Sequence, residues 1–391
     1  MFKNREQIDD SVFSFGFITG YLKKYDYVQI VAATMLLALG VMFIYSTGNQ
    51  VGSKLALTFW VKQLQWICCG LGVWAIMAAG DYRQFKPVSI IIYLFCLALL
   101  VIVLLYGTKI YGARRWLFIS ELNIRLQPSE FSKLGVILLL SALFSSRTFN
   151  VNKFKYLVSA GVIVGVPFLL IAKEPDLGSA LVLLPLSVIM IFAAGLHWKY
   201  ILISLILICS LATGEIINET TQFYPLLKEY QKERILTFLD PERDITYRGY
   251  NQFQAKLAVG SGGMTGKGIG QGTQNTLGFL PQSVSNNDFI FSVIAEETGF
   301  VGCVALILAY IVLLYSMLRT AFVASDTFGR YIAIGIATVF FTHCFINIGM
   351  SIGATPVTGL PLPFVSYGGS FILFAMCSLG ILQSIYRLRK D

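Results

Sequence analysis

Three carboxylates near the start of one long apolar run are the side chains best suited to chemistry. Asp288 directly precedes the run, and Glu296 and Glu297 lie inside it. Asp288 and Glu296 are eight residues apart, which brings them near the same face of a helix. A carboxylate placed there can accept a proton or hold a divalent cation. The two glutamates also predict a polar, water-accessible cavity. The alternative reading of Asp288 is a helix N-cap.

Two further groups of charged residues fall where lipid is expected or at its edge, where charge is costly and usually functional. Glu130 and Lys133, in QPSEFSKL, are three residues apart and therefore neighbours on one helical face. They predict an ion pair facing the helix bundle, with snorkelling to the interface as the alternative. Lys173, Glu174 and Asp176 form a tight turn in KEPDLGSAL. That turn is either part of a binding site or a solvated connection.

A pair of arginines, Arg114 and Arg115, stands in the loop GARRW between two apolar runs. The orientation derived below places this loop outside the membrane, against the usual bias of basic residues. Paired guanidinium groups match the geometry of phosphate oxygens. We therefore expect an anion site here, and the alternative is a tolerated solvated loop.

The composition identifies a membrane protein. Of 391 residues, 56% are hydrophobic and 13% are charged, whereas soluble domains are about 25% charged. The seven cysteines all fall inside apolar runs, which argues against a disulfide framework or a metal site. The first 25 residues lack a clear apolar core with a cleavage site, so we expect the first apolar run to insert uncut.

Helices must position these groups, because about 20 apolar residues span a bilayer as a helix. The sequence contains ten such runs, near 27–47, 61–79, 88–107, 128–145, 156–172, 177–196, 199–217, 289–318, 331–352 and 364–386. Lys and Arg in the short turns and tails place both termini in the cytoplasm. The net charge of +9 then reflects topology rather than a nucleic-acid surface.

The predicted fold is an all-α polytopic membrane protein with about ten transmembrane helices in a single domain, residues 1–391. A long extracytoplasmic loop, 218–287, separates helices seven and eight, leaving spans over 27–217 and 289–386. Its segment GGMTGKGIG does not fit the phosphate-loop pattern. Near the end, GATPVTGLPLPFVSYGGS is rich in proline and glycine. Such backbone must lie within protein or line a cavity, so we expect a re-entrant turn.

These stretches resemble the shape, elongation, division and sporulation (SEDS) family. The motifs that carry the resemblance are GARRW, QPSEFSKL, EPDLGSALV, ERILTFLDPERD, GYNQFQAKLAVGSGGMTGKG, NDFIFSVIAEETGFVG and NIGMSIGATPVTGLPLPFVSYGGS. They cover the chain from about Gly112 to its end. The sequence of the glycine-rich stretch resembles the rod-shape branch of the family more than its division branch.

The resemblance implies site residues. The aspartate that the family requires for polymerisation falls on Asp288, and the family's aromatic position in its first outer motif falls on Trp116. The family's buried Glu–Lys pair falls on Glu130 and Lys133. Two positions depart from the family: Gln282 replaces a glutamate and Asn287 replaces a threonine, in a stretch two residues longer. With the residue arguments above, Arg114, Arg115, Trp116, Lys173 and Asp176 become candidates for substrate binding.

The resemblance also implies an activity and partners. It implies a peptidoglycan glycosyltransferase of the bacterial plasma membrane that polymerises lipid II, a lipid-linked disaccharide-pentapeptide, during cell elongation. The expected partner is a class B penicillin-binding protein, which supplies the transpeptidase; no nucleic acid is expected. The cofactor stays open, and a divalent cation such as magnesium or manganese would suit Asp288. The alternatives are a flippase for the lipid-linked precursor, and a scaffold for the transpeptidase.

Overall fold

The computed structural model describes residues 24–48, 58–110, 113–119, 124–151, 153–199, 238 and 249–389. The predicted seventh run, 199–217, and most of the long loop lie outside the described residues. The other nine predicted runs correspond to α2 (Tyr27–Thr47), α3 (Phe59–Ala79), α4 (Phe85–Tyr106), α5 (Pro128–Phe144), α6 (Phe154–Lys173), α7 (Leu177–Ala193), α13 (Ile290–Val323), α14 (Thr327–Ile352) and α15 (Gly369–Arg387). Within the described ranges, seven helices are long and apolar enough to cross a membrane, and α5 and α7 are shorter.

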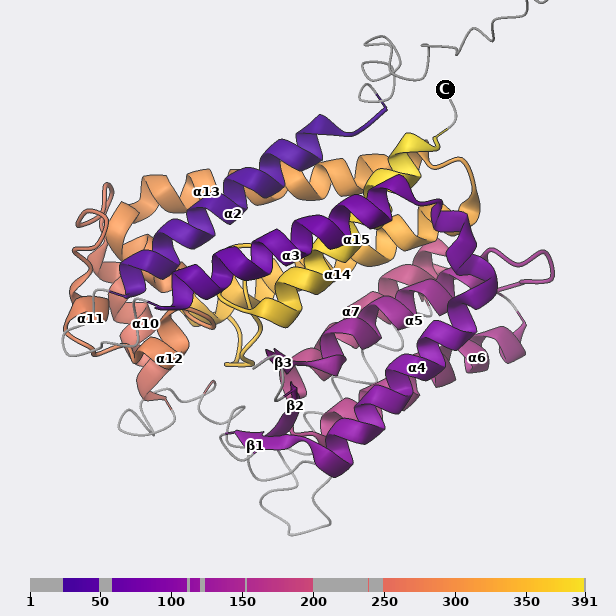
Figure 1. The fold of residues 1–391 in the computed structure, drawn as a ribbon, viewed down its shortest axis with the longest axis horizontal. Helices are drawn as coiled ribbons and strands as arrows, with labels where there is room; N and C mark the ends of the chain where they lie inside the picture. The colour runs from indigo at the N-terminus through magenta and orange to yellow at the C-terminus, as the bar shows by residue number, and fades with distance from the viewer. Residues whose placement is uncertain are drawn as a thin grey trace, which may run out of the picture.

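The long helices pack as two groups that meet along α14. One group holds α2, α3, α13, α14 and α15, and the other holds α4 to α7 (Figure 1). α15 packs against α3, and α13 packs against α2 and α14. α14 also contacts α5 and α7, so it joins the two groups. Most of α14 and α15 is buried, which makes these helices the centre of the protein.

The outer faces of the bundle are apolar, as lipid contact requires. Ile76 on α3 is 70% exposed, and Phe95 on α4 is 62% exposed. Leu169 on α6 and Val301 on α13 are also largely exposed. Large apolar surfaces of this kind are rare on soluble monomers, so the chain is a multi-pass membrane protein.

A small sheet follows α4, where the sequence predicted only a loop. β1 (Thr108–Ile110), β2 (Ala113–Ile119) and β3 (Ile124–Leu126) form an antiparallel sheet in that order. Lys109 pairs with Arg114, and Phe118 pairs with Arg125. The run WLFI combines aromatic and β-branched residues, which favour strands. The sheet therefore gives the residues Ala113–Trp116 a fixed backbone next to the start of α5.

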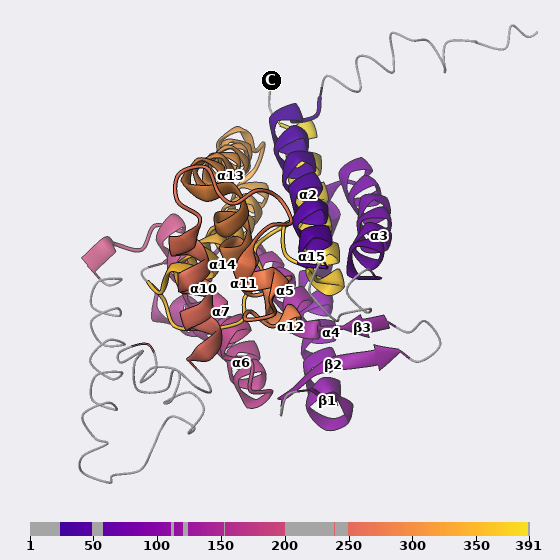
Figure 2. The ribbon, with the colours of Figure 1, turned by 90° about the vertical axis from the view of Figure 1, so that its left-hand side faces the viewer.

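Three short helices gather at the end of the bundle that carries Asp288, referred to below as the Asp288 end. They are α10 (Tyr250–Ser261), α11 (Thr273–Thr276) and α12 (Gln282–Ser285). Figure 2 looks onto this end, with α10 to α12 in front and the sheet beside them. The segment between α10 and α11, residues 262–272, is termed the glycine loop below.

The glycine loop fills a break in α13. Gly299 has a φ of 67° inside the helix, so α13 is interrupted there. Backbone amides of the loop bond to the freed carbonyls, Lys267 to Glu296 at 3.0 Å and Gly268 to Glu297 at 3.0 Å. In return, Phe300 donates its backbone amide to Gly263 at 2.9 Å. Several backbone groups that the break releases therefore bond to the glycine loop, as buried backbone requires.

The predicted re-entrant turn occupies residues 353–368, and its second half is mostly buried in the protein. Leu360, Leu362 and Phe364 are buried, with exposed fractions of 1% or less. Tyr310 of α13 donates its hydroxyl to the Pro363 carbonyl at 2.6 Å. The segment therefore brings irregular backbone to the Asp288 end while neighbouring helices satisfy it, in agreement with the expectation from its proline and glycine content.

Candidate functional site

Asp288 lies between α12 and α13 and is partly exposed. Phe289 occupies the N-cap position of α13, so the structure does not support the reading of Asp288 as that cap. The Asp288 carbonyl accepts a hydrogen bond from Asn347 Nδ2 at 2.9 Å. Asn347 is fully buried and also donates to the Leu360 carbonyl at 2.7 Å. One amide of α14 thus fixes the Asp288 backbone to the re-entrant turn.

The re-entrant turn approaches the Asp288 carboxylate closely at Gly359. This glycine has a φ of 75°, and a Cβ atom there would be 3.2 Å from Asp288 Oδ2. The preceding backbone is held as well, because Tyr367 donates its amide to the Asn286 carbonyl at 2.9 Å. Ser366 Oγ donates to the Asn287 carbonyl at 2.5 Å. Asp288 is therefore a partly exposed carboxylate on a backbone that is anchored on both sides.

Glu130 and Lys133 are brought together near the start of α5. Glu130 Oε2 and Lys133 Nζ are 2.7 Å apart, and the two side chains are 3% and 0% exposed. A buried lysine cannot reach the interface, so the structure does not support the snorkelling alternative. The ammonium also lies 5.5 Å from the ring centre of Phe374 and 3.0 Å from His343 Nε2. Sequence spacing predicted the pair but not the histidine, which is 210 residues away.

The two arginines contact different parts of the protein. Successive residues of a strand point to opposite faces, and β2 separates them accordingly. Arg114 Nη1 donates to the Leu104 carbonyl of α4 at 3.3 Å. Arg115 instead donates to the Pro175 carbonyl, and its Nη1 is 3.7 Å from Asp176 Oδ1. Of the pair, Arg115 is the one that joins the turn before α7.

Asp176 is a buried junction between α5, α7 and β2. It occupies the N-cap position of α7, where Oδ1 accepts the Ser179 amide at 3.2 Å. Its Oδ2 accepts from Gln127 Nε2 at 2.9 Å and from Ser129 Oγ at 3.4 Å. The side chain is only 4% exposed. The structure therefore gives Asp176 several internal partners.

The other candidate binding residues lie at the edges of this cluster. Lys173 is exposed as the last residue of α6. Trp116 is half-buried on β2, and its carbonyl accepts from Thr108 Oγ1 at 3.2 Å. Trp116 follows Arg115 directly in the sequence, and Lys173 lies two residues before Pro175, whose carbonyl Arg115 contacts.

Sequence reasoning grouped Glu174 with Lys173 and Asp176 but did not propose it as a site residue. Glu174 is fully buried, and among the described residues neither of its carboxyl oxygens has a hydrogen-bond partner. Burial and the negative charge of Asp176 raise the pKa of this carboxyl to about 9, although Arg115 opposes the shift. Arg115 and Lys133 balance Glu130 and Asp176 in charge. An ionised Glu174 would add an uncompensated buried charge, so a protonated carboxyl fits the cluster.

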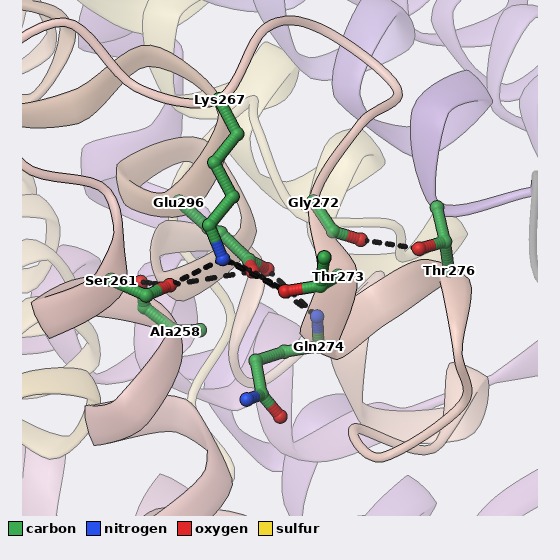
Figure 3. A network of polar contacts seen from close by, with 8 residues as sticks. All are labelled: Ala258, Ser261, Lys267, Gly272, Thr273, Gln274, Thr276 and Glu296. Carbon is green, nitrogen blue, oxygen red and sulfur yellow. Dashed lines mark hydrogen bonds and ion pairs between the residues drawn. The ribbon is translucent and has the colours of Figure 1, made fainter.

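Glu296 and Glu297 do not line the expected water-accessible cavity, because the glycine loop covers them. Their exposed fractions are 0% and 1%. Lys267 Nζ reaches Glu296 Oε1 at 2.7 Å and donates to Ser261 Oγ and Thr273 Oγ1, each at 2.8 Å (Figure 3). All three ammonium protons are therefore used. We call this contact the Lys267–Glu296 clamp.

The clamp belongs to a wider set of contacts between the glycine loop, α13 and α2. The backbone amide of Gln274 donates to Glu296 Oε1 at 3.1 Å, as Figure 3 also shows. Ser46, near the end of α2, donates its hydroxyl to Glu297 Oε1 at 2.5 Å. The sequence signal that could have found the clamp was the lone cation of the glycine-rich segment, facing carboxylates that needed a partner.

Within the described residues, no group of three His, Cys, Asp or Glu side chains could hold a metal ion. The chemical resources at this end are therefore a partly exposed carboxylate, a guanidinium and a buried set of ion pairs. They suit proton transfer and contact with an anionic or hydroxyl-bearing ligand.

Comparisons with known proteins agree over almost the whole chain. A family model of the FtsW, RodA and SpoVE cell cycle proteins matches residues 27–391. The peptidoglycan glycosyltransferase MrdB of Escherichia coli K12 is 36% identical over 364 residues, covering 91% of this chain and 94% of MrdB. The probable peptidoglycan glycosyltransferase FtsW of Trichlorobacter lovleyi is 34% identical, covering 93% of each chain.

Solved structures give the same result. One, described as the structural coordination of polymerization and crosslinking by a peptidoglycan synthase complex, matches with a TM-score of 0.75 and 29% identity, over 93% of this chain and 98% of that chain. The rod shape determining protein RodA of Thermus thermophilus matches with a TM-score of 0.68 and 26% identity, over 94% of this chain and 98% of RodA. Through the matched residues 27–391, the chain belongs to the FtsW, RodA and SpoVE family of cell cycle proteins, the SEDS family.

Proposed function

We propose that the chain is a peptidoglycan glycosyltransferase that polymerises lipid II during cell elongation and maintenance of rod shape. Relatives named peptidoglycan glycosyltransferase match along more than nine-tenths of the chain. The observation that carries the chemical assignment is Asp288, a partly exposed carboxylate on a backbone fixed by Asn347 and the re-entrant turn. It is placed where a polar substrate can meet the helix bundle.

Asp288 acts as the general base in this proposal. The acceptor hydroxyl attacks the anomeric carbon of the donor sugar as the bond from that carbon to the lipid diphosphate breaks. The hydroxyl proton passes to the Asp288 carboxylate while the new glycosidic bond forms. A positioned base typically contributes about 10²- to 10⁴-fold to the rate.

Arg115 is the strongest candidate for contact with the diphosphate. Its side chain is 24% exposed, and the Pro175 carbonyl and Asp176 orient the guanidinium. Arg114, Trp116, Lys173 and Asp176 complete the proposed substrate-binding group, with Asp176 acting from behind Arg115. Glu130 and Lys133 support the group as a buried structural pair.

The proposal includes an orientation. The Asp288 end faces the outside of the bacterial plasma membrane, and both termini lie in the cytoplasm. Basic residues in the turns at the opposite end support it, including Arg83, Lys86 and Arg147. The whole chain, residues 1–391, then forms one membrane domain, with 218–287 outside.

A class B penicillin-binding protein is the proposed transpeptidase partner. One matching structure is described as a peptidoglycan synthase complex that coordinates polymerization and crosslinking. This description supports a complex between the polymerase and a transpeptidase. The described residues do not form a metal site by themselves. A divalent cation such as magnesium or manganese, if the reaction uses one, would be held by the Asp288 carboxylate and would stabilise negative charge on the diphosphate leaving group.

The first prediction tests the base. Asp288→Asn keeps the size of the side chain and removes its charge. We expect this variant to reach the membrane at wild-type levels, bind the transpeptidase and form no glycan when the purified complex receives lipid II. Asn286→Asp, which adds a carboxylate nearby in the Asp288→Asn background, should not restore activity, because the position differs.

Wild-type polymerisation by Asp288→Asn would reject the role of the carboxylate. Vesicles that translocate lipid II without forming glycan, using the wild-type protein, would instead support the flippase alternative. Normal cell shape in a strain that carries only Asp288→Asn would favour the scaffold alternative.

A further inference from the structure

His343 lies between the buried ion pair and the re-entrant turn. Its side chain is fully buried in α14. Nε2 is 3.0 Å from Lys133 Nζ, and Nδ1 is 3.1 Å from the Pro361 carbonyl oxygen. The ring also packs against Phe371 of α15, with a centroid distance of 4.7 Å. One imidazole therefore touches α5, α15 and the re-entrant turn.

The two neighbours of the imidazole determine its tautomer. A lysine ammonium can only donate hydrogen bonds, and a carbonyl oxygen can only accept them. Nε2 must therefore accept from Lys133, and Nδ1 must carry the proton and donate to Pro361. Each end of the ring has a single possible role, so the contacts have a defined direction from the ammonium to the turn.

His343 and Asn347 act on adjacent carbonyls of the turn. They are four residues apart on α14, which places them on the same face of the helix. Asn347 holds the Leu360 carbonyl at 2.7 Å, and His343 holds that of Pro361. Asn347 also holds the Asp288 carbonyl at 2.9 Å. A continuous set of buried and partly buried contacts thus runs from Lys133 through His343 and the turn to the backbone of Asp288.

We propose that His343 is a positioning residue, through which the Glu130–Lys133 pair fixes the re-entrant turn and thereby the place of Asp288. The inference rests on the proposed function for its catalytic consequence. His343 does not touch the substrate or transfer a proton to it. Its contribution is to hold two carbonyls of the turn in one arrangement, because misplacement of a reacting group by about 1 Å can cost 10²-fold in rate.

The test compares two substitutions at His343 in the full-length protein bound to its transpeptidase. His343→Phe keeps a ring against Phe371 but removes both polar contacts. His343→Gln keeps an oxygen that can accept from Lys133 and an amide that can donate to Pro361. Thr342→Val is the control, since Thr342 is also buried and, within the part of the chain that the structure describes, its hydroxyl bonds to the Thr338 carbonyl of its own helix at 2.8 Å.

We expect kcat of His343→Phe to fall tenfold or more, toward about 10²-fold, with KM for lipid II within twofold of wild type. His343→Gln should recover most of kcat, and Thr342→Val should match wild type. Hydrogen exchange should become faster in peptides covering 353–368 in the Phe variant and should return toward wild type in the Gln variant. Rates are compared at equal amounts of folded complex, confirmed by the melting temperature.

A merely structural histidine gives a different pattern. If Phe and Gln variants lose kcat equally at matched melting temperatures, or if exchange in 353–368 does not change, the proposal is wrong. If His343→Phe does not fold, the comparison of His343→Leu with His343→Gln decides in the same way. Failure of Asp288→Asn to lose activity would remove the proposed base, whereas the exchange result at 353–368 would still test the His343 contact.

Discussion

At the scale of single residues, the Asp288 end contains buried and partly buried side chains whose positive and negative charges balance. Lys133 contacts both Glu130 and His343, and Arg115 contacts both Asp176 and the Pro175 carbonyl. Removing one partner of a buried pair costs roughly 3–5 kcal/mol, because it leaves an uncompensated charge. Glu174 fits beside them only as a neutral acid, which makes its protonation a measurable property of the folded state.

The second prediction follows from the raised pKa of Glu174, about 9 in the folded protein. The unfolded chain loses this proton near the ordinary value of 4.5, so the folded state binds more protons between these limits. The free energy of unfolding must therefore fall as pH rises from about 4.5 to about 9, by at most about 1.4 kcal/mol per pH unit from this group.

Glu174→Gln cannot ionise, so it should not show this decrease in the free energy of unfolding. The melting temperature of the variant should decrease less than that of wild type between pH 6 and pH 9. Asp81→Asn, at the opposite end, removes one carboxyl as well and serves as the control. Equal pH profiles for wild type and Glu174→Gln would show that Glu174 is already ionised at neutral pH.

Spacing predicted only one of these partnerships, that of Glu130 with Lys133. Glu130 and Lys133 are three residues apart, and helical geometry alone brings them together. His343 reaches Lys133 only because α14 packs on α5. No local pattern reports that packing, and the same holds for the pairing of Lys267 with Glu296. The sequence identified the residues that needed a partner, and the tertiary structure supplied the partners.

At the scale of elements, the apolar runs predicted the long helices well because length and hydropathy are local properties. All nine runs that fall within the described residues appear as helices, and most of their boundaries agree within four residues. The sheet was missed because its strands are short and carry charged residues among apolar ones. The break in α13 was missed because the run stays apolar on average across Glu296, Glu297 and Gly299, and only the inserted glycine loop explains it.

The third prediction concerns the Lys267–Glu296 clamp, which connects the glycine loop to the helix that follows Asp288. Lys267→Met leaves Glu296 buried without its cation, so stability should fall by roughly 3–5 kcal/mol. Replacing Glu296 by Gln as well removes the orphaned charge. The double variant Lys267→Met/Glu296→Gln should therefore melt at a higher temperature than Lys267→Met alone.

The comparison uses thermal unfolding in detergent, with polymerisation as a second readout. Lys256→Met, a lysine of α10 outside the clamp, controls for the loss of one positive charge. If the double variant melts no higher than Lys267→Met, the ion pair does not account for the stability of the loop.

At the scale of the whole molecule, the helix bundle separates two different ends. The Asp288 end carries the sheet, the short helices and the re-entrant turn, as Figures 1 and 2 show. The opposite end has short turns, including the connection from α5 to α6. This difference fits a protein whose reaction takes place on one side of the membrane, while the described connections between helices on the other side are short.

The fourth prediction tests that orientation by labelling in intact cells. Leu277→Cys places a thiol at the Asp288 end, where the native side chain is 61% exposed. Thr148→Cys places one in the exposed α5–α6 connection. Both are built on a background in which the exposed Cys68 and Cys69 are serine. A maleimide that cannot cross the plasma membrane should label Leu277→Cys and leave Thr148→Cys unlabelled until the cells are opened.

Labelling of Thr148→Cys in intact cells, with Leu277→Cys protected, would invert the proposed topology. Both variants must support normal growth, so that the label reports on a functional protein.

The meeting of Gly266 and Gly299 restricts how this protein can diverge. A Cβ atom at Gly266 would lie 2.2 Å from the Glu297 carbonyl oxygen, and one at Gly299 would lie 2.3 Å from the Gly266 amide nitrogen. Both atoms that would be struck belong to the backbone, so no change of a neighbouring side chain can make room. A second mutation in a side chain therefore cannot compensate for a substitution at either glycine. Lipid-facing positions can drift in descendants of this sequence, while these two glycines can change only if the loop or the helix is rebuilt.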